Sequence, residues 1–346
     1  MKALVWQAAE RMEWLEREIP VPEPGEVLLK VEAVGICGSE IEGYLGHNSL
    51  RVPPLIMGHE FCAVVADAGR AGGRWREGGR VVVNPLLSCG VCVQCRRGRV
   101  MLCSRRQIVG IHRPGAFAHY VAVPESALIE IPDGISPYRA ALSEPLACAY
   151  RATRRALRDH PLSPVVVFGA GGIGLLCAMA AKRLGASAVM IVDLNEDRLR
   201  TAASLGIDFT VNPAAADLRE EVRRAFGPEG FDVAVDAAGF QPTRAMAAKL
   251  LNPGGTWMNI GLGIDDTTIP FNHLIRSEIE VLGSFCYSHD DFRQAVALLT
   301  GGRITEEGWT EIRPMSAGQQ AFDDLVKGRV HAGKIFLVPD GGEAYA

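Results

Sequence analysis

The clearest pattern of hydrophobic and polar positions lies between residues 165 and 195. Val165–Phe168 is an uninterrupted run of β-branched and aromatic residues, which predicts a fully buried strand. A glycine-rich loop follows, then an apolar stretch long enough for a helix, and then a second apolar run that ends at Asp193. Strand, loop, helix and strand in this order predict a βαβ unit, from which parallel sheets are built.

Helical and strand patterns continue to alternate after this unit. Helices are predicted over Glu196–Gly206 and Gln241–Leu251, and strands over Phe231–Gly239, Thr256–Gly261 and Ile279–Ser284. We therefore expect an α/β fold with a six-stranded, doubly wound parallel sheet.

The first third of the chain has a different pattern. Short apolar runs are broken by prolines and glycines, with Val27–Cys37 as the clearest strand, and this indicates an all-β opening. An alanine-rich helix is expected from about Pro137. A further helix is expected from about residue 288, followed by a β return near the C-terminus. The first domain would therefore comprise residues 1–150 and 288–346, with the sheet domain, residues 151–287, inserted in it.

One stretch is also long enough to be considered as a membrane span, because the 18 residues Pro164–Ala181 contain no charged side chain. Its first part is a glycine-rich loop, and Lys182 and Arg183 follow in the same helix, so we do not expect a span.

Composition narrows the functional classes. The 346 residues suffice for two domains, and the formal net charge of −4 argues against nucleic-acid or anionic-membrane partners. The N-terminus lacks the apolar core of a signal peptide, so a cytoplasmic protein is expected. Nine cysteines in a chain of this length indicate metal binding rather than a disulfide scaffold.

The loop after Phe168 fits the dinucleotide fingerprint G-x-G-x-x-G. The helix N-terminus after it can bind a pyrophosphate. Asp193 is placed to bind the ribose hydroxyls and would repel a 2′-phosphate, which favours NAD over NADP. Arg198 fits either an adenosine-phosphate contact or a solvated helix face. The expected cofactor contacts in this region are Gly169, Gly171, Gly172, Ile173, Gly174, Asp193 and Arg198.

Four clustered cysteines predict a metal site. Cys89, Cys92, Cys95 and Cys103 are spaced C-x2-C-x2-C-x7-C, and four thiolates can close a tetrahedral Zn²⁺ site with no open position. Such a site is structural. An iron–sulfur cluster also uses four thiolates and is the alternative on these residues alone.

A second metal site is suggested by Cys37, His59, Glu60 and Glu144. Thiolate, imidazole and carboxylate suit Zn²⁺, and a carboxylate in the apolar stretch around Glu144 is costly to bury unless it is paired or binds a cation. A buried cysteine, a core histidine and a helix-end ion pair are the structural alternatives.

Together these motifs resemble the zinc-dependent medium-chain dehydrogenases, the alcohol, sorbitol and threonine dehydrogenase group. The resemblance spans nearly the whole chain and rests on Gly58-His59-Glu60, the four-cysteine lobe, Glu144-Pro145-Leu146-Ala147 and the glycine fingerprint, in the family's order. It implies a GroES-like β domain joined to a Rossmann domain. It also implies one catalytic and one structural zinc per chain, with Cys37 and His59 as catalytic ligands and Glu144 and Glu60 at or near that metal.

The resemblance implies further roles. Ser39 matches the hydroxyl that takes the substrate's proton. Backbone groups at Ile260, Gly261 and Ser284 match those that hold the nicotinamide carboxamide, and Lys334 lies where a cation often reaches the pyrophosphate.

Two positions depart from the family's pattern. Glu40 replaces the usual aspartate that accepts a hydrogen bond from the histidine ligand, and Glu42 replaces a histidine that passes the proton onward. Glu42 would relay the proton, contact a polyhydroxylated substrate or point to solvent. His47 is an alternative relay. Tyr44 matches an aromatic position near the substrate, with a core position as the alternative.

The expected function is reversible, zinc-dependent, NAD-linked oxidation of a secondary alcohol, a polyol or sugar alcohol, to a ketone. L-Threonine 3-dehydrogenase is an alternative enzyme, and a non-catalytic nucleotide-binding protein is the alternative from another class. The expected partners are a small-molecule substrate and identical subunits in a homodimer or homotetramer.

Overall fold

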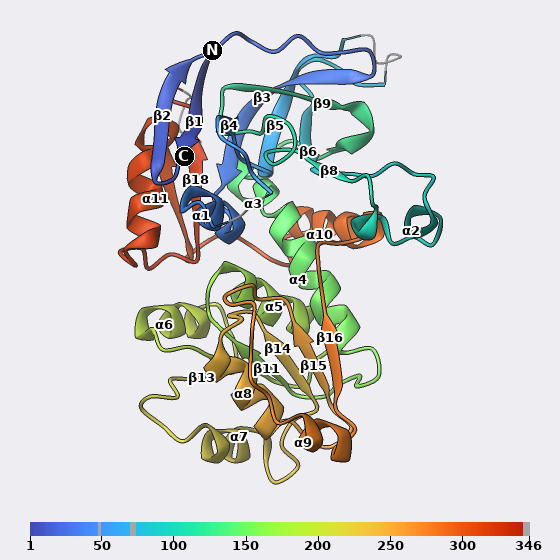
Figure 1. Ribbon diagram of the computed structural model, residues 1–346, viewed down its shortest axis with the longest axis vertical. Coiled ribbons are helices and arrows are strands. Elements are labelled where there is room, and N and C mark those ends of the chain that lie inside the picture. Colours follow the sequence, from blue (N-terminus) through green and yellow to red (C-terminus); the bar gives the residue numbers. More distant parts are fainter. Residues whose placement is uncertain (48–49, 70–73, 342–346) are drawn as a thin grey trace. The chain divides into compact units, whose positions relative to one another are not determined.

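The computed structural model describes residues 1–47, 50–69 and 74–341, and contacts within them divide the chain into two units. The first unit joins Met1–Glu144 with Ser288–Ala346, and the second is Pro145–Tyr287. Figure 1 shows the N-terminal strands, in blue, and the strand Lys334–Val338 (β18), in red, within the same unit. The sequence pattern predicts domain boundaries after residues 150 and 287, and these boundaries stay predictions.

The first unit is organised by a seven-stranded sheet in which β3 is central. Along β3, Val27, Leu29 and Val31 are buried while Lys30 between them is exposed, as the alternating pattern predicts. The C-terminal strand β18 pairs antiparallel with β3, with Phe336 opposite Gly35. The sheet order is β10-β6-β5-β3-β18-β17, with β9 also on β3. The strands are β3 (Glu26–Gly35), β5 (Glu60–Asp67), β6 (Arg80–Val83), β9 (Tyr120–Pro124), β10 (Leu128–Glu130), β17 (Thr310–Pro314) and β18 (Lys334–Val338).

Smaller sheets and short helices complete this unit. A three-stranded sheet has the order β2-β1-β4, and β7 pairs with β8. These strands are β1 (Lys2–Ala8), β2 (Arg11–Glu16), β4 (Leu55–Ile56), β7 (Leu86–Leu87) and β8 (Gln107–Ile108). The α-helices are α1 (Gly38–Tyr44), α2 (Val93–Arg96), α3 (Pro137–Ala141), α10 (His289–Thr300) and α11 (Gly318–Val326). Short 3₁₀ turns cover Val100–Leu102, Glu125–Ala127 and Met315–Ala317.

Aromatic residues from distant segments meet in the core of the first unit. The ring of Phe322 lies 5.1 Å from that of Tyr44 and 5.9 Å from that of Phe117. Tyr44 is 1% exposed, and its hydroxyl donates to Asp323 Oδ1 at 2.6 Å. Of the two interpretations of Tyr44, the structure therefore supports the core position.

The second unit contains the predicted six-stranded parallel sheet. Its order, β13-β12-β11-β14-β15-β16, places β11 and β14 side by side where the strand order reverses, so the doubly wound fold is confirmed. Ligands of such sheets bind outside the carboxyl ends of the strands at this point. The strands are β11 (Val165–Phe168), β12 (Val189–Val192), β13 (Phe209–Val211), β14 (Val233–Asp236), β15 (Thr256–Asn259) and β16 (Glu280–Gly283).

Helices connect these strands, and polar side chains begin several of them. Asn195 Oδ1 accepts from the backbone N–H groups of Asp197 and Arg198 at the start of α6, which is a typical N-cap. The alanine-rich stretch from Pro137 forms α3 and then α4, separated at Leu142. The helices here are α4 (Ser143–Ala156), α5 (Gly172–Arg183), α6 (Glu196–Ser204), α7 (Leu218–Phe226), α8 (Gln241–Leu250) and α9 (Phe271–Arg276). In the described part of the chain, no helix combines the length and apolarity needed to cross a membrane.

Candidate active site and metal centres

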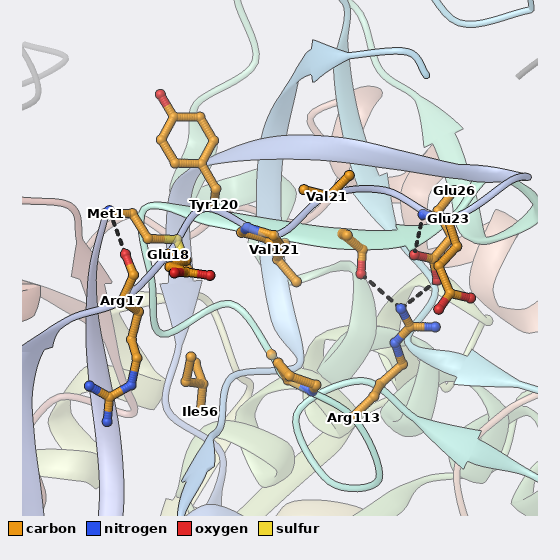
Figure 2. Close-up of a pocket in the computed structure, with 14 residues that line it drawn as sticks. Met1, Arg17, Glu18, Val21, Glu23, Glu26, Ile56, Arg113, Tyr120 and Val121 are labelled. Atoms are coloured by element: carbon orange, nitrogen blue, oxygen red, sulfur yellow. Dashed lines mark hydrogen bonds and ion pairs between the residues drawn. The ribbon is translucent and has the colours of Figure 1, made fainter. Parts of the chain in front are cut away.

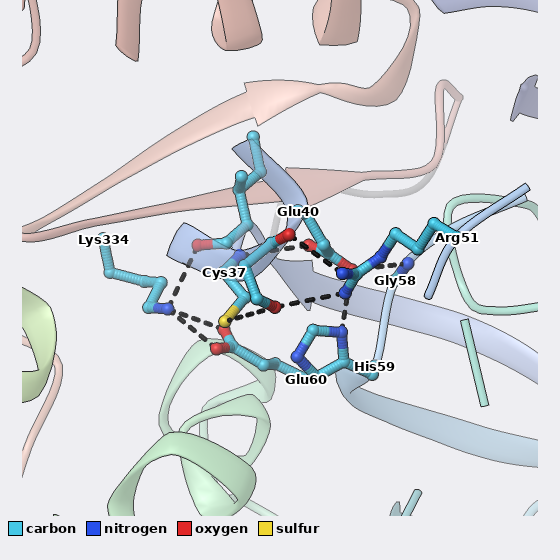
Figure 3. A network of polar contacts seen from close by, with 9 residues as sticks. Cys37, Glu40, Arg51, Gly58, His59, Glu60 and Lys334 are labelled. Carbon is cyan, nitrogen blue, oxygen red and sulfur yellow. Dashed lines mark hydrogen bonds and ion pairs between the residues drawn. The ribbon is translucent and has the colours of Figure 1, made fainter. Parts of the chain in front are cut away.

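The predicted catalytic metal residues meet at the ends of β3 and β5. Gly35 pairs with Glu60 across these strands, and Cys37 follows Gly35 by two residues. One donor atom each from Cys37, His59 and Glu60 lie within 4.8 Å of one another (Figure 3). His59 and Glu60 are 5% and 1% exposed. A thiolate, an imidazole and a carboxylate this close together fit a zinc ion.

Glu40 orients the histidine of this cluster. It is 0% exposed, and its Oε1 lies 2.8 Å from His59 Nδ1. The backbone N–H of Gly58 donates to Oε1, and that of Cys37 donates to Oε2. Burial alone would raise the pKa of Glu40, but the charges of His59 and Arg51 and these hydrogen bonds hold it below its usual value. The longer side chain thus does the work expected of the family's aspartate and leaves Nε2 of His59 for a metal.

Ser39 lies against the same cluster. Its hydroxyl is 3.3 Å from Cys37 Sγ, to which it donates. Arg51, which is 3% exposed, donates to both the backbone oxygen and the hydroxyl of Ser39. The predicted proton acceptor is therefore held beside the predicted metal ligands, and by a residue that the sequence did not indicate.

Lys334 completes the buried network. Its ammonium donates to both carboxylate oxygens of Glu60, at 2.7 and 3.0 Å, and to Ile36 O at 3.1 Å. Burial alone would lower the pKa of Lys334, but the charge of Glu60 outweighs it and the pKa is raised. Sequence reasoning missed this pairing. No local sequence signal could have found it, because the contact arises from the pairing of β18, which begins at Lys334, with the end of β3. Its pyrophosphate contact stays a prediction.

Other predicted residues lie farther out. Glu144, 8% exposed in the first turn of α4, is not in the group of donor atoms within 4.8 Å. Glu42 and His47 form a surface pair, with Oε2 and Nδ1 3.5 Å apart and side chains 51% and 66% exposed. The two suggested relay residues are therefore neighbours.

The sulfur atoms of the four-cysteine lobe, from Cys89, Cys92, Cys95 and Cys103, lie within 4.8 Å of one another. In Figure 1, the lobe's helix α2 stands apart from the main sheet of the first unit. A tetrahedral zinc with Zn–S bonds of about 2.3 Å requires sulfur atoms about 3.8 Å apart. The sulfur of Cys95 is 3.5 Å from that of Cys92 and 4.0 Å from that of Cys89, and Cys103 is 3.5 Å from Cys89. This spacing fits a single ion, whereas an iron–sulfur cluster would need room for several atoms between the thiolates.

The lobe also favours the thiolate form of one ligand. Backbone N–H groups of Val91 and Cys92 point to the sulfur of Cys89 and lower its pKa to about 5. Because metals bind the thiolate, a sulfur that ionises readily is suited to this role.

The glycine loop has the geometry of a phosphate cradle. Gly169 has φ of +99°, which favours glycine. A Cβ on Gly174 would lie 1.8 Å from Gly169 O, so α5 packs directly on the loop. A Cβ on Gly171 would meet nothing within 4 Å, so the loop leaves open space at the helix start, as a pyrophosphate requires.

The other predicted cofactor residues lie at the carboxyl ends of strands of the same parallel sheet. Asp193 follows β12, and its carboxylate accepts from the backbone N–H groups of Ala170 and Asn195, at 2.6 and 2.8 Å. Ile260 and Gly261 both donate to Asp236 O. Ser284 follows β16, and its buried hydroxyl has no hydrogen-bond partner among the described residues. An unpaired buried hydroxyl at this edge fits a polar ligand.

A separate cavity lies elsewhere in the first unit. It measures about 710 Å³, and Figure 2 shows Met1, Arg17, Glu26 and Arg113 along its walls. Arg113 pairs with Glu26 at 2.5 Å, and the N-terminal amine donates to Arg17 O. Its lining contains none of the predicted site residues, and these polar groups bind one another.

Two family models match the chain. The alcohol dehydrogenase GroES-like domain matches residues 23–133, and the zinc-binding dehydrogenase family matches residues 172–301. The first range contains Cys37, His59 and the four-cysteine lobe, and the second begins at the glycine loop.

Several curated proteins are similar over nearly their whole length. D-xylulose reductase A of Aspergillus niger is 32% identical over 94% of both chains. L-galactonate-5-dehydrogenase of Escherichia coli K12 is 32% identical over 89% of both. L-threonine 3-dehydrogenase of Chelativorans sp. is 35% identical, covering 93% of this chain and 98% of the relative.

Solved structures agree with the fold. A zinc-binding dehydrogenase from Sinorhizobium meliloti bound to NADP has a TM-score of 0.91 at 32% identity, covering 98% of this chain and 99% of the other. An alcohol dehydrogenase from Escherichia coli CFT073 complexed with NADH has a TM-score of 0.89 at 28% identity, with the same coverage. The chain therefore belongs to the zinc-binding medium-chain dehydrogenases, and it is an oxidoreductase that uses zinc and a nicotinamide dinucleotide.

Proposed function

We propose that the protein oxidises a secondary alcohol of a polyol or sugar alcohol to a ketone, reversibly and with NAD. The observation that carries this proposal is the buried cluster of Cys37, His59 and Glu60 with the Ser39 hydroxyl beside it. A proton acceptor next to a metal ligand set is what alcohol oxidation requires. Sugar-linked relatives, the xylulose reductase and the galactonate dehydrogenase, support a polyhydroxylated substrate.

The chain's own residues have distinct parts in this reaction. Cys37 and His59 hold the catalytic zinc, with Glu144 as a further carboxylate ligand and Glu60 at or near the metal. When bound, zinc acts as a Lewis acid that makes the substrate hydroxyl more acidic, and NAD accepts the hydride. The four-cysteine lobe holds the structural zinc.

The proton leaves by way of Ser39 in α1. Ser39 Oγ accepts the proton of the substrate hydroxyl as its own hydroxyl proton passes toward the ribose of NAD, and from there the proton goes to the half-exposed Glu42 or to solvent. The position of Glu42 beside His47, 3.5 Å away on the surface, supports this exit, because both side chains are more than half exposed to water.

Asp193 favours NAD over NADP. Its carboxylate accepts a hydrogen bond from the Ala170 N–H in the glycine loop. At this position the carboxylate can bind ribose hydroxyls and would repel a 2′-phosphate. Arg198 is the opposing feature, because its buried Nε has no hydrogen-bond partner among the described residues. Asp193→Ala should therefore raise kcat/KM for NADP relative to NAD.

L-Threonine 3-dehydrogenase is the second candidate. It is favoured by the relative of that name, which is 35% identical, and by acidic side chains such as Glu42 that could meet an ammonium group.

A substrate panel tests the proposal. NADH formation is measured with sorbitol, xylitol, arabitol, galactitol, L-threonine, 2,3-butanediol and ethanol, each with and without a chelator. Chelator-sensitive activity on polyols supports the proposal. Activity on L-threonine alone replaces it with the second candidate. Size-exclusion chromatography tests the proposed homodimer or homotetramer.

A further inference from the structure

A buried arginine reaches the serine beside the metal cluster. The Arg51 guanidinium donates from Nη1 to Ser39 O at 2.9 Å and from Nη2 to Ser39 Oγ at 3.1 Å. A planar guanidinium that contacts both the backbone and the side chain of one residue restrains its position and its rotamer together. Within the described residues, Arg51 Nε has no hydrogen-bond partner, so the terminal nitrogens aimed at Ser39 are its anchors.

The loop that carries Arg51 buries a charged side chain and exposes apolar ones, the reverse of the usual preference. Arg51 is 3% exposed, whereas its apolar neighbours Leu50 and Val52 are 54% and 72% exposed. Burying a charge is costly, and exposing two apolar side chains forgoes their burial. In a loop folded for stability alone, the apolar side chains of Leu50 and Val52 would be buried and the guanidinium of Arg51 would be exposed. The burial of Arg51 between two exposed apolar residues therefore indicates that its guanidinium has a functional role.

Helix α1 provides the space for the arginine stem. A Cβ on Gly43 would lie 2.7 Å from Arg51 Cδ, so any larger residue there would displace the side chain. Gly43 stands four residues after Ser39, and residues at this spacing share one face of a helix.

We propose that Arg51 is a positioning residue for the reaction, fixing Ser39 in the rotamer that accepts the substrate's proton. A serine hydroxyl has one donor and two acceptor sites. Arg51 occupies one acceptor site, and the hydroxyl hydrogen points to Cys37 Sγ at 3.3 Å. One lone pair of Oγ is left with a defined direction. Without the guanidinium, the hydroxyl can rotate among its staggered positions. This inference rests on the proposed role of Ser39.

A double-mutant cycle tests it, using kcat for the best polyol of the panel. Ser39→Ala should lower kcat by about 10²-fold or more, the usual contribution of a proton-transfer group. Arg51→Met should lower kcat by about 10- to 100-fold, the effect of a misplaced reacting group, with the KM for NAD and the zinc content unchanged. Because Arg51 acts through Ser39, Arg51→Met should have almost no further effect in the Ser39→Ala background.

Two further measurements separate positioning from a structural role. Added guanidinium ion should restore part of kcat in Arg51→Ala, which leaves room for the ion, and Arg51→Lys, which keeps a buried cation, should fall between wild type and Arg51→Met. Gly43→Ala, which displaces the stem from the other side, should reproduce the loss of kcat. If Arg51→Met does not fold, the Arg51→Lys and Gly43→Ala cycles with Ser39→Ala replace it.

The outcomes distinguish this inference from the function on which it rests. Multiplicative losses from the Ser39 and Arg51 substitutions, or a loss of kcat that follows loss of zinc, would overturn the role of Arg51 while leaving the proposed function intact. An unchanged kcat in Ser39→Ala would remove the proposed proton path, and the role of Arg51 with it.

Discussion

Oε1 of Glu40 lies 2.8 Å from Nδ1 of His59, with both side chains buried. This contact decides which nitrogen of the imidazole faces the cluster, because a ring nitrogen that binds a carboxylate cannot also bind the metal. The same carboxylate accepts from the N–H groups of Gly58 and Cys37. Glu40 thus ties the two segments that carry Cys37 and His59 to one another.

Loss of this carboxylate should weaken the catalytic zinc site. Glu40→Gln keeps the size of the side chain but removes its charge, and partners of this kind typically contribute 10- to 100-fold in metal affinity. We expect a drop of that order in competition with a chelator. Glu42→Gln, two residues along the same helix and half-exposed, is the matched control and should retain wild-type zinc affinity. Equal affinity in all three proteins would contradict the role given to Glu40.

The four-cysteine lobe should fold around its own zinc. Cys92→Ser removes one of four thiolates, and the binding energy of a structural zinc is part of the folding energy. The variant should lose one zinc per chain and melt at a lower temperature, as measured by metal analysis and thermal unfolding. Cys286→Ser, a partly exposed cysteine outside the lobe, should change neither quantity. A Cys92→Ser protein with wild-type zinc content would show that the lobe is not a metal site.

Two glycines of one loop should respond differently to alanine. In Gly174→Ala, the new Cβ would clash with Gly169 O at 1.8 Å, so the second unit should be destabilised. In Gly171→Ala, the Cβ meets no protein atom within 4 Å, so the melting temperature should stay near the wild-type value while NADH binding weakens. Fluorescence titration with NADH and thermal unfolding measure the two effects. Wild-type NADH affinity in Gly171→Ala would place the pyrophosphate elsewhere.

The Lys334–Glu60 pair should matter most when only one partner is removed. Lys334→Met leaves the Glu60 carboxylate, 1% exposed, without its cation, and breaking a buried pair in this way typically costs about 3–5 kcal/mol. Lys334→Met/Glu60→Gln removes both charges and should be less destabilised than Lys334→Met alone. Urea denaturation gives the unfolding free energies. A double variant less stable than Lys334→Met would mean that the charge of Glu60 is compensated by another group.

Much of the fold was predictable because its signals are local. The run Val165–Phe168, the glycine loop and the terminal Asp193 define a βαβ unit by pattern alone, and the six-stranded sheet is confirmed. The cysteine lobe was equally readable, since its four ligands lie within one short segment. The break between α3 and α4 at Leu142 was not, because that stretch has helix-forming residues throughout.

The site was only partly predictable, because several of its contacts are non-local. Arg51 lies in a loop with prolines and polar residues, where an arginine is normally solvated, and Gly43, on another segment, makes room for it. Lys334 meets Glu60, 274 positions away in the sequence, because β18 pairs with the end of β3. No pattern in one segment reports such pairings.

Zinc content and turnover of Cys37→Ser, measured together, test the central claim most directly. The account predicts two zinc ions per chain in the wild type and one in Cys37→Ser, with NADH binding retained and NADH formation from the polyol lost. Turnover at the wild-type rate in a Cys37→Ser protein that holds one zinc per chain would contradict the account, because the reaction would then proceed without the cluster at Cys37, His59 and Glu60.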